Sequence, residues 1–241
     1  MLILSNGIPK SGSTLFSWFQ KDILMHSIPK NGQELFEQSV NEKHIDGIGH
    51  FAENIEDKSI LEKLISISEE NGPFLVKCHT SITDDLKEAV KSGKIIVTLT
   101  HRDPRDILLS VIDHGKRDKI TNSSKYFAQF QTIEQTIPFV IAQCNIALEW
   151  IDSGLVEIFR YQDLISNPHH EILRFCKIIN HKPSMNKIDK IVKTYTTSPT
   201  IGMRQYNTGK LLRYKEEMTI KEIELCNKAL SYFITRLGYQ L

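Results

Sequence analysis

The chain has no excess of charge of either sign and no long apolar run. Its 30 lysine and arginine residues are balanced by 29 acidic residues, which leaves a formal net charge of +1 at pH 7. A nucleic-acid-binding protein normally carries a broad basic field, so this class is not expected here. No apolar stretch approaches the roughly 20 residues of a membrane-spanning helix. The first apolar run already begins at Met1, and we therefore expect neither a signal peptide nor a membrane segment.

Cysteine is also scarce, and its spacing is not that of a metal site. The four cysteines lie far apart and form no C-x-x-C pair. This pattern favours free thiols in a reducing compartment and argues against bound zinc or another structural metal. We accordingly predict a cytoplasmic protein that needs no metal. The cysteines are Cys78, Cys144, Cys176 and Cys226.

The length of 241 residues and the apolar content of 40% suit one soluble domain, which we place at residues 1–241. Short apolar segments at 1–4, 73–79, 95–100 and 156–161 are typical of strands, and the third is almost entirely β-branched. Their alternation with helical patterns predicts an α/β fold, a three-layer sandwich with a mostly parallel central sheet. Helices are expected at 57–70, 83–91, 104–114, 125–152, 168–180, 184–194 and 219–237.

Local signals refine these boundaries. Asp103 precedes a proline and is expected to cap the helix that follows it. Gly115 is expected to end the same helix. Pro138 lies inside the longest helical pattern and predicts a bend or a break there. Residues 27–56 are predicted to be irregular or short-helical, and residues 195–214 to be irregular.

The segment from Gly7 to Thr14 is close to a phosphate-binding P-loop. A standard P-loop, G-x-x-x-x-G-K-[ST], has a lysine after its second glycine, and this lysine reaches the β- and γ-phosphates of a triphosphate. Here that position is Ser13, and the loop's lysine is Lys10. Loop N–H groups ahead of a helix still bind a phosphate. The sequence therefore predicts a P-loop-like phosphate site that is not built for triphosphate chemistry.

Further polar residues follow the other predicted strands. His79, Arg102 and Tyr161 each come at the end of a strand, as the loop does. Ligands of parallel α/β sheets bind beyond the carboxyl ends of the strands. We therefore expect these residues to converge on one site.

These segments, in this order, resemble sulfotransferases that use 3′-phosphoadenosine 5′-phosphosulfate (PAPS), of the cytosolic and bacterial P-loop type. The loop resembles the family's P-K-S-G-T-T, and four later segments resemble K-T-H, R-N-P-K-D-x-x-x-S, Y-E-D-L…N-P and R-K-G-x-x-G. A last one resembles the K-x-x-x-T-V-x-x-x-E dimer segment. The matching residues are Pro9 to Thr14, Lys77 to His79, Arg102 to Asp106 with Ser110, Tyr161 to Leu164 with Asn167-Pro168, Arg204 with Gly209, and Lys215 to Glu224.

The resemblance implies a cofactor site for PAPS and its product, 3′-phosphoadenosine 5′-phosphate (PAP), without a divalent metal. The loop would hold the 5′-phosphosulfate and the arginines the 3′-phosphate, because a guanidinium suits a phosphate oxygen pair. The residues that it assigns to the cofactor are Lys10, Ser11, Gly12, Ser13, Thr14, Arg102, Ser110, Tyr161, Arg204 and Gly209.

The resemblance also implies a catalytic set. His79 would act as the general base that takes a proton from the acceptor. Lys10 would stabilise the charge that develops on the leaving bisphosphate. Lys77, two residues earlier on the strand, would point to the same side as His79. The resemblance implies that Lys77 lies near the transferring sulfuryl group and that Ser110 assists.

Two departures from the family pattern stand out. Leu15 replaces the tryptophan that stacks on adenine, and Gln205-Tyr206 replaces a Lys-Gly pair. The acceptor is not encoded in any motif. The mixed polar and aromatic composition of 27–56, 115–135 and 195–214 favours a small alcohol, amine or glycoside over a polyanion.

Two other functions fit part of the pattern. A small-molecule kinase or NTPase with an altered P-loop predicts magnesium-dependent turnover of ATP, and the missing lysine at Ser13 argues against it. A non-catalytic nucleotide-binding protein predicts bisphosphate binding without transfer. Homodimerisation through Lys215–Glu224 is a further expectation, although Thr219 is equally suited to cap a helix there.

Overall fold

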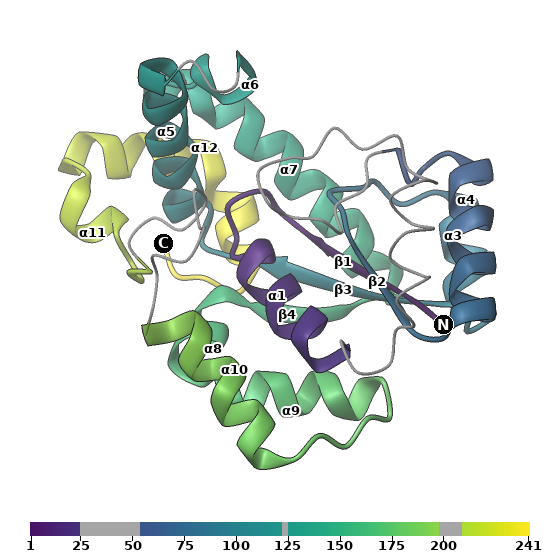
Figure 1. Ribbon diagram of the computed structural model, residues 1–241. Helices are drawn as coiled ribbons and strands as arrows, with labels where there is room; N and C mark the ends of the chain where they lie inside the picture. Colours follow the sequence, from purple (N-terminus) through teal and green to yellow (C-terminus); the bar gives the residue numbers. More distant parts are fainter. Residues whose placement is uncertain (25–53, 122–124, 198–208) are drawn as a thin grey trace.

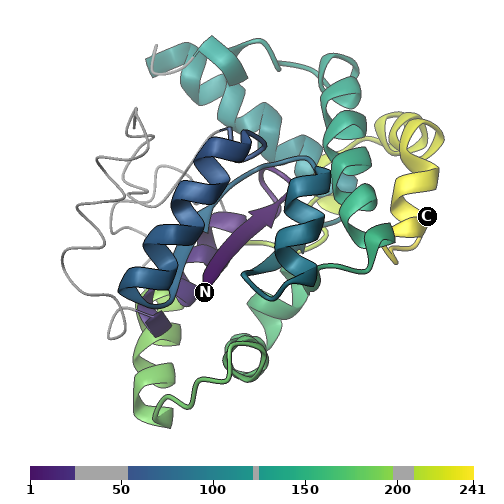
Figure 2. The ribbon, with the colours of Figure 1, turned by 90° about the vertical axis from the view of Figure 1, so that its right-hand side faces the viewer.

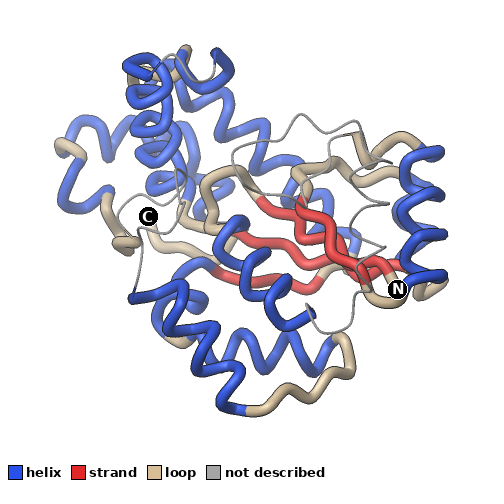
Figure 3. Tube along the Cα trace, viewed as in Figure 1, coloured by secondary structure: helices blue, strands red, loops and turns tan. Residues whose placement is uncertain are grey.

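The computed structural model describes residues 1–24, 54–121, 125–197 and 209–241. Its sheet has four parallel strands in the order β2-β1-β3-β4 (Figure 3). The strands are β1 (Leu2–Gly7), β2 (Phe74–Lys77), β3 (Ile95–His101) and β4 (Glu157–Arg160). This confirms the predicted α/β architecture. Most of the segments 27–56 and 195–214 lies outside the described residues, but the irregular prediction is wrong at 195–197, which are helical, and at Tyr214, which begins a short helix.

Helices cover both faces of the sheet (Figures 1 and 2). Successive strand residues face opposite sides, so Leu2 and Leu4 enter one hydrophobic core and Ile3 enters the other. The first core includes side chains of α3 (Lys58–Asn71), α4 (Asp84–Lys91), α5 (Pro104–Thr121), α7 (Ile133–Ser153) and α12 (Ile220–Arg236). The second includes side chains of α1 (Ser13–Leu24), α8 (Tyr161–Ser166), α9 (Pro168–Ile178) and α10 (Met185–Thr197).

The helix predicted to end at Gly115 continues to Thr121. Gly115 is buried in the middle of α5, where an added Cβ would lie 2.4 Å from the carbonyl oxygen of Phe130 and 2.5 Å from that of Phe127. The glycine is therefore explained by a close backbone approach and not by helix termination. Asp103 caps α5 as predicted, since its Oδ1 accepts the N–H of Arg105 at 3.0 Å.

The long helix predicted over 125–152 is two helices, α6 (Lys125–Ala128) and α7. The break falls at residues 129–132 and not at Pro138, through which α7 continues. Thr132 starts α7 by accepting the N–H of Gln135 on its side chain. Pro138 comes just over one turn later, where its missing N–H removes a single helical hydrogen bond.

The helices predicted at 57–70, 83–91, 168–180, 184–194 and 219–237 are present with boundaries close to the predicted ones. α11 (Tyr214–Glu217) lies just before α12, and Thr219 forms a capping box with Glu222 at the start of α12. All four cysteines are buried free thiols, as predicted. None of the described helices is long and apolar enough to cross a membrane.

Candidate active site

The phosphate loop joins the end of β1 to the start of α1. Lys10 and Gly12 both have positive φ, 68° and 86°, which turns the backbone sharply, and the N–H of Ser11 between them donates to the carbonyl oxygen of Ile8 at 3.0 Å. The first turn of α1, from Ser13, adds the positive end of a helix. Ser11 anchors the loop, because its buried hydroxyl donates to the carbonyl oxygen of Thr100 on β3 at 2.9 Å.

Asn6, which the sequence analysis missed, ties the loop to the segment after β2. Its Oδ1 accepts the N–H groups of Gly7 at 2.9 Å and Thr80 at 3.2 Å, and its amide donates to the carbonyl oxygen of Thr80. Trp150 of α7 donates to the same carbonyl oxygen at 2.8 Å. The signal available in the sequence is a polar residue at the end of the apolar run of β1, where Asn6 is only 2% exposed.

His79 contacts both the phosphate loop and Lys77. Its Nδ1 lies 2.6 Å from the carbonyl oxygen of Gly7, and its Nε2 lies 2.9 Å from Nζ of Lys77. A carbonyl oxygen only accepts hydrogen bonds, so Nδ1 carries the proton and donates. Nε2 of the neutral ring then accepts from Lys77. The arrangement fixes the tautomer in which Nε2 is the basic nitrogen.

Burial lowers the pKa values of both side chains. Burial lowers the pKa of Lys77 to about 8. The pKa of His79 falls well below 6.5, first because of burial and then because of the positive charges of Lys77 and Lys10. His79 is therefore an uncharged base at neutral pH.

A small hollow opens beside His79. It has room for about one water-sized group, and its walls come from the end of β1, from β3 and from α7. The α7 side is formed by Gln143, Ile146 and Ala147, and Ile8 and Leu99 complete the apolar wall. A small group placed there would lie against the base.

Arg102 lies at the end of β3 and is held on several sides. Its Nη2 donates to Oδ2 of Asp106 at 3.0 Å and to the carbonyl oxygen of Lys210 at 2.7 Å. Its guanidinium carbon lies 4.3 Å from the ring centre of Tyr161. Arg102 is only 6% exposed, so its position is fixed by these contacts.

Tyr161 connects Arg102 to the phosphate loop. It opens α8, where the sequence predicted the last residue of a strand. A Cβ added to Gly12 would lie 2.4 Å from Cδ2 of Tyr161, so the ring packs directly on the loop backbone. One face of the site therefore consists of loop, aromatic ring and guanidinium in contact.

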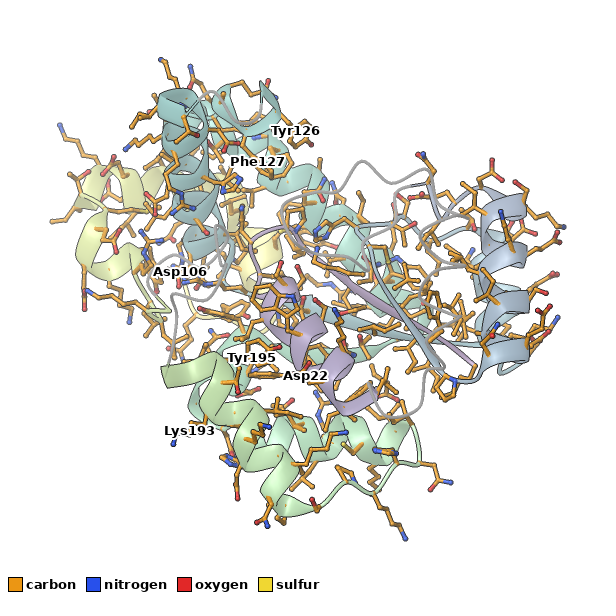
Figure 4. The ribbon with its side chains drawn as sticks, in the orientation of Figure 1. Asp22, Asp106, Tyr126, Phe127, Lys193 and Tyr195 are labelled. Atoms are coloured by element: carbon orange, nitrogen blue, oxygen red, sulfur yellow. The ribbon has the colours of Figure 1, made fainter. Side chains whose placement is uncertain are left out.

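Asp106, Ser110 and His114 follow one another at four-residue intervals on one face of α5. The ring of His114 packs edge-on against Phe127, with centroids 4.8 Å apart. Nζ of Lys10 lies 5.0 Å from the centre of the Phe127 ring. Figure 4 shows Asp106 of α5 at one level and Phe127 of α6, with Tyr126 beside it, at another. This face of α5 therefore contacts Arg102 through Asp106 at one end and, through His114 and Phe127, approaches Lys10 at the other.

The structure brings most of the predicted site residues together. Ser13 and Ser110 are buried, Thr14 is half-buried, and Gly209 has a φ of 65° and directly precedes Lys210. Arg204 lies outside the described residues. Arg105, inside a matching segment, is a structural residue, because it pairs with Asp103 and also donates to Asn227 and to the carbonyl oxygen of Gln240.

The sequence matches the family description "Sulfotransferase domain" over residues 2–229. The chain therefore belongs to the sulfotransferase domain family, a family of enzymes. No curated protein matches the sequence.

Solved structures share the fold at low sequence identity. Mouse sulfotransferase SULT7A1 complexed with PAP is 13% identical with a TM-score of 0.62, over 98% of this chain and 85% of that chain. Retinol dehydratase in complex with retinol and PAP is 14% identical with a TM-score of 0.58, over 100% of this chain and 82% of that chain. Retinol dehydratase with androsterone and PAP is 13% identical with a TM-score of 0.52, over 100% and 81%.

Proposed function

We propose that the protein transfers a sulfuryl group from PAPS to a hydroxyl or amine of a small acceptor. Family membership supplies the class of reaction. The observation that carries the proposal is the contact of His79 with both Gly7 and Lys77. It joins a neutral base, a cation and the phosphate loop at one point, which is what transfer from a phosphosulfate requires.

The residues present fit such a cosubstrate. PAPS supplies the sulfuryl group and a bisphosphate leaving group. The loop from Lys10 to Thr14 offers backbone N–H groups and a helix N-terminus to the 5′-phosphosulfate. Arg102 suits the 3′-phosphate, because its Nε and Nη2 are engaged while no hydrogen bond to another described residue occupies Nη1. Ser110, on the same face of α5 as Asp106, is proposed to assist there.

His79 is proposed as the general base. The bond to Gly7 keeps Nδ1 protonated and orients Nε2 to receive the acceptor's proton. Lys77 holds Nε2 in this structure, so the lysine must turn away before the base acts. An anionic sulfuryl group beside Lys77 would draw its ammonium away from the ring. Lys10 is proposed to neutralise charge on the leaving group.

The acceptor is proposed to be a small alcohol, amine or glycoside whose reacting hydroxyl or amine approaches His79 at the hollow lined by α7. The two alternative functions, a kinase and a non-catalytic nucleotide-binding protein, predict different behaviour. A kinase would need a phosphate-binding lysine at Ser13, and that position is 3% exposed and close to Gly7. A non-catalytic protein would bind PAP without turnover.

Two further proposals concern the whole protein. Homodimerisation is proposed to use the exposed stretch from Lys215 to Glu224, in which Ile220 is 76% exposed. A cytoplasmic location is supported by the four buried free thiols, which suit a reducing compartment.

Calorimetric titration with PAP and with ATP, each with and without magnesium, tests the function. Metal-independent binding of PAP with little binding of ATP is expected, and incubation with PAPS and a panel of alcohols, amines and glycosides should then yield a sulfated product. Magnesium-dependent ATP binding without affinity for PAP would overturn the proposal in favour of the kinase. Tight PAP binding without any transfer would favour the non-catalytic protein.

A further inference from the structure

From the contacts between α1 and α10 we infer that Trp18 and Tyr195 form the stacking platform for the adenine of the nucleotide. This inference rests on the proposed function, because it concerns the base of the same cosubstrate. It assigns a role to two aromatic residues that no motif of the sequence singled out. It also resolves the departure at Leu15, where the expected tryptophan is missing.

Leu15 is not available to a ligand. It is 7% exposed and belongs to the second hydrophobic core with Phe16 and Phe19. A larger ring at this position would have to displace that core. Any aromatic contact to the base must therefore come from another residue.

Trp18 offers such a contact one turn farther along α1. The rings of Trp18 and Tyr195 are stacked, with centroids 5.5 Å apart and an angle of 24° between their planes. Both residues are half-buried, so part of the pair's surface is exposed. An exposed surface of stacked aromatic rings binds nucleobases in many proteins because every base has a π face.

The platform is held firmly. The Tyr195 hydroxyl donates to Oδ2 of Asp22 at 2.9 Å. The ring of Phe19 also packs edge-on against the Tyr195 ring, with centroids 5.7 Å apart. Nζ of Lys187 donates to the carbonyl oxygen of Ile23 at 2.9 Å and ties α10 to the end of α1. Figure 4 shows Tyr195 and Asp22 together between these two helices.

The platform also lies at a suitable place relative to the phosphate loop. Thr14 and Trp18 are four residues apart and share one face of α1. Four residues correspond to about 6 Å along a helix axis. A ribose separates a 5′-phosphate from its base by a distance of the same order. The helix that receives the phosphate at its start therefore presents a ring where the base would follow.

Tryptophan fluorescence provides a direct test, because the chain contains two tryptophans. Trp150 is fully buried and bonded to Thr80, whereas Trp18 is accessible. Titration of the intact wild-type protein with PAP should change the tryptophan emission. The Trp18→Phe variant should lose this change while its PAP affinity by calorimetry stays within about threefold, since a phenyl ring still stacks.

Removal of the Trp18 ring should weaken the contact with the adenine of PAP and leave the contacts with its phosphates intact. Trp18→Ala should bind PAP roughly tenfold more weakly, as expected when one base–aromatic stack is lost. Wild type should also prefer PAP over uridine 3′,5′-bisphosphate, and Trp18→Ala should lose much of that preference. The comparison of the two bisphosphates in the wild type does not depend on how well the variant folds.

The outcomes separate this inference from the proposed function. Binding of PAP to the wild type with no Trp18-dependent emission change and no base preference would overturn the platform and leave the function standing. Unchanged PAP affinity in a folded Trp18→Ala protein would assign the pair to helix packing only. Failure of the wild type to bind PAP at all would overturn both.

Discussion

Nδ1 of His79 lies 2.6 Å from the carbonyl oxygen of Gly7, so the proposed base is bonded to the first residue of the phosphate loop. The base and the anion site therefore cannot shift independently. Because Nδ1 keeps its proton to donate this hydrogen bond, Nε2 is the nitrogen that can accept a proton. A single contact thus sets both the position and the tautomer of the histidine.

Replacement of His79 separates its basicity from this contact. His79→Asn retains a side-chain amide able to donate to Gly7 but has no basic nitrogen. We expect transfer to fall about 10²- to 10⁴-fold, while the affinity for PAP changes little. Single-turnover transfer and calorimetry on the same preparation measure both. Near-normal transfer by His79→Asn would show that His79 is not the base.

The pH dependence of transfer follows from the position of the His79 pKa. A base acts in its neutral form, which persists above its pKa. Burial and the neighbouring lysines keep the pKa of His79 well below 6.5, so kcat/KM should not decline as the pH is lowered from 7.5 through 6.5. A decline centred near 6.5 would indicate a solvent-exposed base of ordinary pKa.

Lys77 should lower the stability of the folded protein. Burial lowers its pKa from 10.5 to about 8, and one pKa unit corresponds to about 1.4 kcal/mol. The folded state releases this proton before the unfolded state does, so the free energy of unfolding should rise between about pH 8 and 10.5. Lys77→Met should stabilise the protein by up to about 3 kcal/mol at pH 7 and remove this rise. Urea unfolding at pH 7 and pH 9.5 tests both, and transfer should fall in the same variant.

Gly12→Ala should damage the site through the Tyr161 ring. The new Cβ would lie 2.4 Å from that ring, in a backbone with φ of 86°. Gly93→Ala is a matched control, because its φ is 72° and nothing lies within 4 Å of the added Cβ. Both variants should lose about 1 kcal/mol or more to backbone strain. Only Gly12→Ala should also lose PAP affinity, and equal affinities in the two variants would contradict the role of the Gly12–Tyr161 contact.

Arg102 and Arg105 lie three residues apart, yet their substitution should have different effects. Arg102→Gln is expected to weaken PAP binding by about 1.5–3 kcal/mol, the value of a hydrogen bond to a charged group. Arg105→Gln should lower the melting temperature, since it breaks the pairing with Asp103 and the link to Gln240, with little change in affinity. Arg102→Gln also leaves the buried Asp106 without its salt-bridge partner, so both variants should lower the melting temperature and only PAP affinity distinguishes the roles. Unchanged affinity in a folded Arg102→Gln protein would exclude Arg102 from the 3′-phosphate site.

The strands and the phosphate loop could be predicted because their signals are local. The β-branched run of β3 and the loop from Gly7 to Thr14 each carry their pattern within a few residues. The same holds for the caps at Asp103 and Thr219, whose side chains bind backbone groups two or three residues away. Local patterns of this kind survive folding because they need no distant partner.

Other features depend on residues far apart in the sequence. The sequence pattern at Gly115 predicts a helix end, whereas its role depends on the carbonyl oxygens of Phe127 in α6 and of Phe130 in the segment between α6 and α7. Likewise, no spacing in the sequence indicates that Tyr161 lies between Gly12 and Arg102. The strand pattern placed Lys77 and His79 on one side, but their hydrogen bond became visible only in three dimensions.

The buried thiols have a practical consequence for the chemistry of labelling. Burial raises the pKa of Cys78 and of Cys144 to about 12 and of Cys176 and of Cys226 to about 11. None of them will react readily with maleimide or iodoacetamide near neutral pH. The wild-type chain is therefore an unreactive background in which one cysteine introduced at Ile120, which is 84% exposed, can carry a fluorophore or spin label at a single known position.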